Sequence, residues 1–186
     1  GSSGCRFKGS MLGYGMSAGR RCGMGMYEGR DINSEVIAMA LKRTLPNDIL
    51  LDEVVLLVEA GETVTLMTKG VSMLPFIVGG RDSVVLVRPD GLFPGMIVLA
   101  YAKGDRYVLH RIVSIDDGQV TLMGDGNIRG VESCGIEDVK AVAVRIVRPS
   151  GEIDCLGQRH LKRAAMWKRL LPARRCILAV YKRLFL

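Results

Sequence analysis

One serine in the sequence has neighbours that suit nucleophilic chemistry. Ser72 lies in the segment G-V-S-M-L-P, between Gly70 and Pro75. Gly70 would let the backbone approach a bound peptide closely, and Pro75 would make the turn rigid. The N–H of Ser72 would then be available to bind an oxyanion. Taken alone, however, such a segment is more often an ordinary polar turn.

A serine hydroxyl is a weak nucleophile until a neighbouring base removes its proton. The chain has two histidines, and His160 lies among basic residues near the C-terminus, so His110 in L-H-R-I is the single candidate base. Its imidazole would titrate near pH 6.5 and could accept the Ser72 proton at neutral pH. The alternative is a histidine on the surface of a strand. Arg111 is expected on the opposite face of that strand, in a structural role.

The elements that must position these residues can be predicted from the spacing of apolar side chains. Residues 47–60 are predicted to form a helix, because Asn47 suits an N-cap and Gly61 ends the helical pattern. A short helix is also predicted over 31–44, where Pro46 would close it. After Gly61 the pattern becomes typical of short strands separated by glycine-containing turns. Six strands are predicted, at 63–68, 83–88, 96–102, 107–115, 119–123 and 139–147.

These elements predict a mainly β fold: a small, bent antiparallel sheet or partly open barrel with an N-terminal helix and a basic amphipathic C-terminal helical tail. The tail should form two helical pieces divided by Pro172. We therefore expect four parts, at 1–30, 31–61, 62–150 and 151–186. The first part holds nine glycines and no apolar periodicity, and is expected to be disordered or foreign to the fold.

Composition and charge narrow the class of protein. The 186 residues suit one ordinary domain, and the net charge is +7. Residues 155–186 contain nine Lys and Arg and no acidic residue, so the rest of the chain carries −2. The five cysteines form no C-x-x-C pair, and we expect neither a disulfide framework nor a bound metal or cofactor. No secretory signal or membrane-spanning run is evident, so we expect a cytoplasmic protein or one peripheral on a membrane.

Several segments, taken in order, resemble the peptidase domain shared by type I signal peptidases and the LexA/UmuD-like self-cleaving proteins. The resemblance covers about residues 62–148 and implies that fold and a serine peptidase activity. The matching segments are G-V-S-M-L-P, G-R-D-S-V-V-L-V (80–87), P-G-M-I-V-L-A (94–100), Y-V-L-H-R-I-V (107–113), L-M-G-D-G-N (122–127) and A-V-A-V-R-I-V.

The resemblance also implies roles for single residues. Bacterial signal peptidases and LexA-like proteins use a lysine base, whereas archaeal and endoplasmic-reticulum signal peptidases use a histidine, and His110 stands at that place. Gly70 replaces a hydroxyl residue that many bacterial relatives carry there, so an oxyanion hole here would be formed mainly by backbone. Such an enzyme would cut after small residues in an extended peptide, through an acyl-enzyme.

A base histidine usually needs a carboxylate on its second ring nitrogen, and two residues compete for this role. Asp125 lies in G-D-G-N, which resembles an acid-bearing segment of the His-type signal peptidases. Those enzymes usually carry their third catalytic residue further downstream, where this chain has Glu132. Asp125-Gly126 could equally be a hairpin turn. A calcium loop is excluded there, because Arg129 and Ile136 stand where oxygen ligands belong.

Two other functions and three roles for the tail remain open. The chain could cleave itself, with Ala18-Gly19 and Ala60-Gly61 as candidate bonds, or it could be a catalytically silent peptide-binding module. The tail could lie on an anionic membrane surface or pack on the protein's own sheet. Binding of nucleic acid is the weakest alternative, since no helix-turn-helix or aromatic platform accompanies the charge.

Overall fold

The computed structural model describes residues 47–185, all within one unit of the chain, Ala40–Leu186. The predicted helix at 31–44 and the segment 1–30 lie outside the described residues. The described chain is mainly β, which confirms the predicted fold class. The helices are α2 (Asn47–Glu59), α3 (Gln158–Arg169) and α4 (Arg174–Phe185), with a short 3-10 helix η1 (Ile136–Asp138). The strands are β1 (Val64–Met67), β2 (Ser83–Val87), β3 (Ile97–Ala102), β4 (Arg106–Asp116), β5 (Gln119–Met123), β6 (Glu132–Gly135), β7 (Val139–Arg148) and β8 (Gly151–Asp154).

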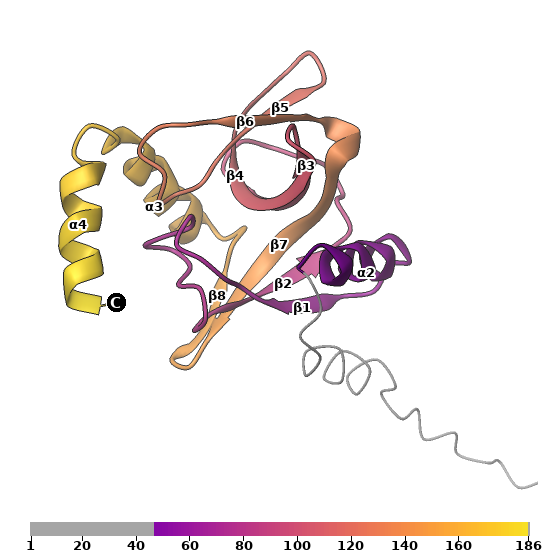
Figure 1. The fold of residues 1–186 in the computed structure, drawn as a ribbon, viewed down its shortest axis with the longest axis horizontal. Helices are drawn as coiled ribbons and strands as arrows, with labels where there is room; N and C mark the ends of the chain where they lie inside the picture. The colour runs from indigo at the N-terminus through magenta and orange to yellow at the C-terminus, as the bar shows by residue number, and fades with distance from the viewer. Residues whose placement is uncertain (1–46, 186) are drawn as a thin grey trace, which may run out of the picture. The chain divides into compact units, whose positions relative to one another are not determined.

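All strand pairs are antiparallel, in the order β1-β2-β7-β3-β4-β5-β6, with β8 added on β7. The register slips at Val85/Leu86, Leu99/Ala100 and Ile112/Ser114. Such irregularities bend strands and increase their twist. The sheet accordingly curls into a half-barrel, with α2 on one side and α3 and α4 on the other (Figure 1).

The six predicted strands are all present, with ends that differ by at most one residue. The sequence analysis did not predict β6 or β8. Both have four residues, and neither shows the β-branched alternation on which the other predictions depended. Strand β8 occupies the first residues of the predicted tail, so the sheet extends to Asp154 before the helices begin.

Helix α2 packs on one face of the sheet, at the spacing the sequence predicts. Val54, Val55 and Val58 are buried in the main core, whereas Leu56 points outward. A hydrogen bond from the Tyr107 hydroxyl to Asp52 Oδ1, 2.8 Å long, also ties α2 to β4. A second cluster fills the curl between β3, β4, β5 and β7.

The C-terminal helices pack on the segment that follows Ser72. Trp167 of α3 and Leu178 of α4 form a small buried cluster with Leu74 and Val78. The tail therefore packs on its own domain through part of its surface, which was one of the alternatives that the sequence left open. Between residues 47 and 185, no helix has the length and apolarity needed to cross a bilayer.

Candidate active site

Close backbone packing fixes the loop that leads to Ser72. Gly70 has φ +80°, a conformation that favours glycine. Gly79 lies against this loop so closely that a Cβ there would come within 2.3 Å of the Gly70 carbonyl oxygen. Only glycine fits at position 79. The two glycines therefore bring the start and the end of the loop into direct backbone contact.

Asp82 holds both ends of the same loop through hydrogen bonds. Its backbone carbonyl accepts hydrogen bonds from the N–H and the hydroxyl of Thr68, at 3.1 and 2.6 Å. Its fully buried carboxylate accepts the Val78 N–H at 3.0 Å and a bidentate pair of bonds from Arg81. Burial alone would raise the pKa of Asp82, but these donors and nearby Arg148 lower it below its ordinary value. Asp82 is thus a structural carboxylate.

Ser72 lies in a turn, and of its two backbone polar groups only the carbonyl forms a backbone hydrogen bond within residues 47–185. Its carbonyl accepts the Gly126 N–H at 2.7 Å. Among residues 47–185, its N–H donates to no backbone carbonyl, so it remains available to another acceptor. The side chain is half-buried. The turn continues with a bond from the Ile77 N–H to the Met73 carbonyl at 3.0 Å.

His110 lies on β4 with its ring directed toward the Ser72 turn. It is 5% exposed. A Cβ on Gly124 would lie 3.0 Å from His110 Nε2 and 2.5 Å from the Ser72 carbonyl oxygen. Gly124 therefore lets the histidine ring and the Ser72 backbone approach one another. The Ser72 atom recorded beside Gly124 is its carbonyl oxygen, and the contact of a serine hydroxyl with its base often tightens only when substrate binds.

Glu132 supplies a carboxylate on the other side of the ring. Its Oε2 lies 2.7 Å from His110 Nδ1, although the contact is not aligned as a hydrogen bond. Its Oε1 accepts a bond from Arg106, which holds the carboxylate in place. Burial lowers the pKa of His110 below its ordinary value, and the Glu132 charge offsets part of that shift. The imidazole is therefore neutral at neutral pH.

Asp125 is bound to Arg111 rather than to His110. Arg111 Nε donates to Oδ1 at 2.9 Å, and its Nη2 donates to Oδ2 at 2.7 Å. Both side chains are buried. Because alternate residues of a strand face opposite sides, His110 and Arg111 each receive one of the two candidate carboxylates. The structure places Glu132 beside His110 Nδ1, brings the Ser72 backbone near Nε2 across Gly124, and pairs Asp125 with the neighbouring arginine.

Arg111 also joins several separate segments. Its Nη1 donates to the Gly95 carbonyl at 2.6 Å, and its guanidinium lies 5.1 Å from the centre of the Phe76 ring. Its Nη2 lies 3.4 Å from His160 Nε2. Burial, and then the Arg111 charge, lower the pKa of His160 to about 4. His160 is thus a neutral core residue of α3.

Two further donors from the tail hold the 124–127 loop, and the sequence analysis did not identify them. Trp167 Nε1 donates to the Asp125 carbonyl at 2.8 Å. The buried Arg174 donates through Nη1 to the Asn127 carbonyl at 2.9 Å and stacks over the Trp167 ring. Two features of the sequence could have indicated these donors: Trp167 is the single tryptophan, and Arg174 is an arginine within an apolar helical stripe.

An apolar cavity of about 170 Å³ opens beside Ser72. Helix α2, strand β1, the loop after it and strands β3 and β4 form its walls. Its lining residues include Leu51, Leu66, Met73, Leu99 and Leu109.

Ser72 lines this cavity, whereas His110 and Glu132 are not among its lining residues. Together the three residues supply a hydroxyl, a neutral imidazole and a carboxylate, and the Ser72 backbone adds an N–H that donates to no backbone carbonyl among residues 47–185. These are the parts that acyl transfer requires. In the described part of the chain, no three His, Cys, Asp or Glu side chains cluster as metal ligands would. Comparisons with protein-family models, curated proteins and solved structures give no match.

The Arg111–Asp125 pair should dominate the stability of this region. We expect Asp125→Asn to lower the free energy of unfolding by about 3–5 kcal/mol, because it leaves a buried guanidinium without its counter-charge. Urea denaturation measures the change. Glu152→Gln is the matched control, since its pair with Arg145 is half exposed and should contribute less than about 1 kcal/mol. Equal losses in the two variants would contradict this role.

The Trp167 bond should hold the loop locally. We expect Trp167→Phe to make the Gly126 amide exchange with solvent about fivefold faster, because the Asp125 carbonyl loses a donor that contributes about 1 kcal/mol. Hydrogen exchange followed by NMR measures the rate. The Leu86 amide in β2 is the internal control. An unchanged rate at Gly126 would show that the indole N–H does not hold the loop.

Proposed function

We propose that this protein is a serine endopeptidase, with Ser72 as the nucleophile, His110 as the general base and Glu132 as the residue that orients His110. One observation carries the proposal. The Gly126 N–H donates to the Ser72 carbonyl, a Cβ on Gly124 in the same loop would lie 3.0 Å from His110 Nε2, and Glu132 Oε2 lies 2.7 Å from Nδ1. The resemblance to signal peptidases with a histidine base supports the same assignment.

The proposed reaction follows from these positions. His110 Nε2 takes the proton of the Ser72 hydroxyl as Oγ bonds to the carbonyl carbon of the peptide. In this proposal the Ser72 N–H stabilises the resulting oxyanion. The C–N bond then breaks, and the imidazolium returns its proton to the leaving amine. Water, activated by His110, next cleaves the acyl-enzyme and restores the serine. Glu132 stabilises the imidazolium in both steps.

Features beside Ser72 suit a peptide in an extended conformation. Strand β1 leads toward Ser72 and, within the described residues, pairs along one edge only, with β2. A peptide strand could add to the other edge by main-chain hydrogen bonds. The adjoining cavity would then accept an apolar side chain of the substrate. The preference for small residues rests on the family resemblance.

Self-cleavage at Ala60-Gly61 has weaker support. A peptide bond must be extended for such an attack, whereas the Ala60 N–H donates to the Leu56 carbonyl in the last turn of α2, at 3.0 Å. Ala18-Gly19 lies outside the described residues. A catalytically silent peptide-binding module is the remaining alternative.

Covalent labelling tests the nucleophile and the base. We expect a fluorophosphonate probe to label the wild type, not to label Ser72→Ala, and to label His110→Ala about 10² to 10⁴ times more slowly, because the base is lost. Mass spectrometry of the intact protein measures the extent. Ser83→Ala is the matched control and should label normally. Labelling at the normal rate without His110 would remove that residue from its role, and a folded wild type that does not label would favour the silent module.

The pH dependence of labelling tests Glu132. The reactive form is neutral His110, so the rate should fall on acidification through a pKa below the ordinary histidine value. In Glu132→Gln we expect this acid limb to move to still lower pH, because the carboxylate that favours the imidazolium is gone. The plateau rate should fall at least about a hundredfold. Glu62→Gln, at an exposed site, is the control. An acid limb that stays in place or moves upward would exclude the contact from catalysis.

A further inference from the structure

Helix α4 has an apolar surface wider than the part that the domain covers. With 3.6 residues per turn, Arg174, Leu178 and Tyr181 share one face of the helix. Arg174 and Leu178 are buried against the domain, and Tyr181 is half-buried. Ile177 and Val180 lie on the adjoining flank and are 37% and 59% exposed. Part of the apolar arc therefore remains in contact with solvent.

Helix α3 and the connection after it also have a buried inner face and exposed apolar residues on the outside. Its inner face is buried through His160, Ala164 and Trp167. Met166, with Leu170 and Leu171 just beyond the helix, stays exposed. Scattered exposed apolar residues are ordinary on a protein surface, but here they gather in one short stretch of chain.

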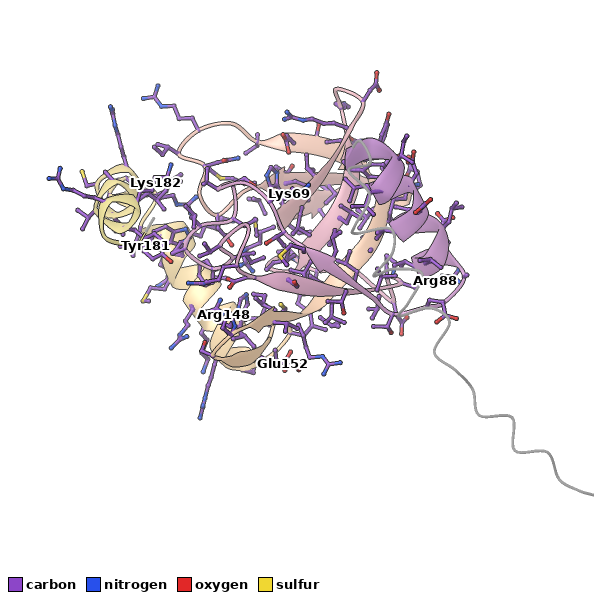
Figure 2. The ribbon with its side chains drawn as sticks, turned by 60° about the horizontal axis from the view of Figure 1, so that its bottom comes forward. Lys69, Arg88, Arg148, Glu152, Tyr181 and Lys182 are labelled. Atoms are coloured by element: carbon purple, nitrogen blue, oxygen red, sulfur yellow. The ribbon has the colours of Figure 1, made fainter. Side chains whose placement is uncertain are left out.

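The same stretch carries an unusual charge. Residues 155–186 contain nine Lys and Arg and no acidic residue. Eight of the nine are exposed, and Arg174 alone is buried. Among residues 49–183, whose side chains the structure describes, no ion pair includes any of these nine side chains. Lys182 lies on α4, at the end of the molecule remote from α2 (Figure 2).

We propose that the outer surface of α3 and α4 binds an anionic membrane surface, with both helices still packed on the domain. Exposed apolar residues beside Lys and Arg are the two features that an in-plane helix needs at a lipid interface. The inner surface already has its partners in the domain, so binding requires no undocking of the helices.

Charge and apolarity together favour lipid over other partners. A second copy of the chain would bring two cationic surfaces together, and their repulsion would oppose such a contact. Nucleic acid would match the charge but would leave Ile177 and Val180 without an apolar partner. Anionic lipid matches both features of the surface. The inference does not depend on the proposed peptidase activity.

Co-sedimentation with lipid vesicles tests the surface, and Ser72→Ala protein keeps the measurement separate from catalysis. The probe is vesicles of equal parts phosphatidylcholine and phosphatidylserine, compared with phosphatidylcholine alone. We expect binding to the anionic vesicles, little binding to the neutral ones, and weakening as salt is added. Equal binding to both kinds of vesicle, or to neither, would overturn the proposal.

Paired variants identify the surface. Removing two charges, in Lys182→Gln with Arg183→Gln, should lower the partition coefficient about thirtyfold. Ile177→Ser with Val180→Ser should lower it at least about tenfold. The matched controls are Arg88→Gln with Lys103→Gln, and Ile49→Ser with Leu56→Ser, which alter exposed residues elsewhere. Equal losses in test and control variants would contradict the assignment.

Two further measurements address the other partners. Sedimentation velocity would reveal self-association, and a gel shift with duplex DNA would reveal nucleic-acid binding. A dimer that dissociates in Ile177→Ser with Val180→Ser would assign the surface to a second copy and overturn the proposal. So would tight DNA binding that exceeds lipid binding and is unaffected by those two substitutions. A monomer that binds anionic vesicles through both sets of residues supports it.

Discussion

The buried ion pair between Arg111 and Asp125 is the constraint on which the site depends. Taking two charges out of water is costly, and their attraction offsets that cost only when the remaining donors and acceptors are also satisfied. Here they are, because Arg111 also binds the Gly95 carbonyl and stacks on Phe76, while three of its contacts reach the Asp125 carboxylate. A guanidinium can serve these partners at once through its fixed fork of donors, whereas an ammonium could not.

That pair fixes the 124–127 loop, and the loop in turn fixes the distance between Ser72 and His110. Two glycines make the approach close enough, because a Cβ at Gly124 or Gly126 would clash with the backbone of the Ser72 turn. The site is therefore assembled largely from backbone. Its polar side chains form two pairs, Arg111 with Asp125 and His110 with Glu132.

The sequence predicted the strands well because β-branched runs between glycine-containing turns leave few alternatives. It also predicted that His110 and Arg111 face opposite sides of their strand. It could not choose between Asp125 and Glu132, because that choice depends on β6, a four-residue strand with no clear pattern. Once β6 pairs with β5 and β5 with β4, Glu132 reaches the His110 face and Asp125 the other. The proximity of Ser72 and His110 rested on the family resemblance, since spacing along the chain says little about distance in a curled sheet.

The tail shows why one amphipathic pattern can serve two surfaces. Apolar residues at helical spacing predicted two amphipathic pieces divided by Pro172. The described helices α3 and α4 divide their apolar residues between an inner face, which holds the 124–127 loop through Trp167 and Arg174, and an outer flank that includes Ile177 and Val180. The inner face keeps the helices folded and in place, because its apolar side chains and hydrogen-bond donors already have partners in the domain. Contact with a lipid surface would then add the burial of the outer flank without the entropic cost of ordering a free peptide, because the domain has already met that cost.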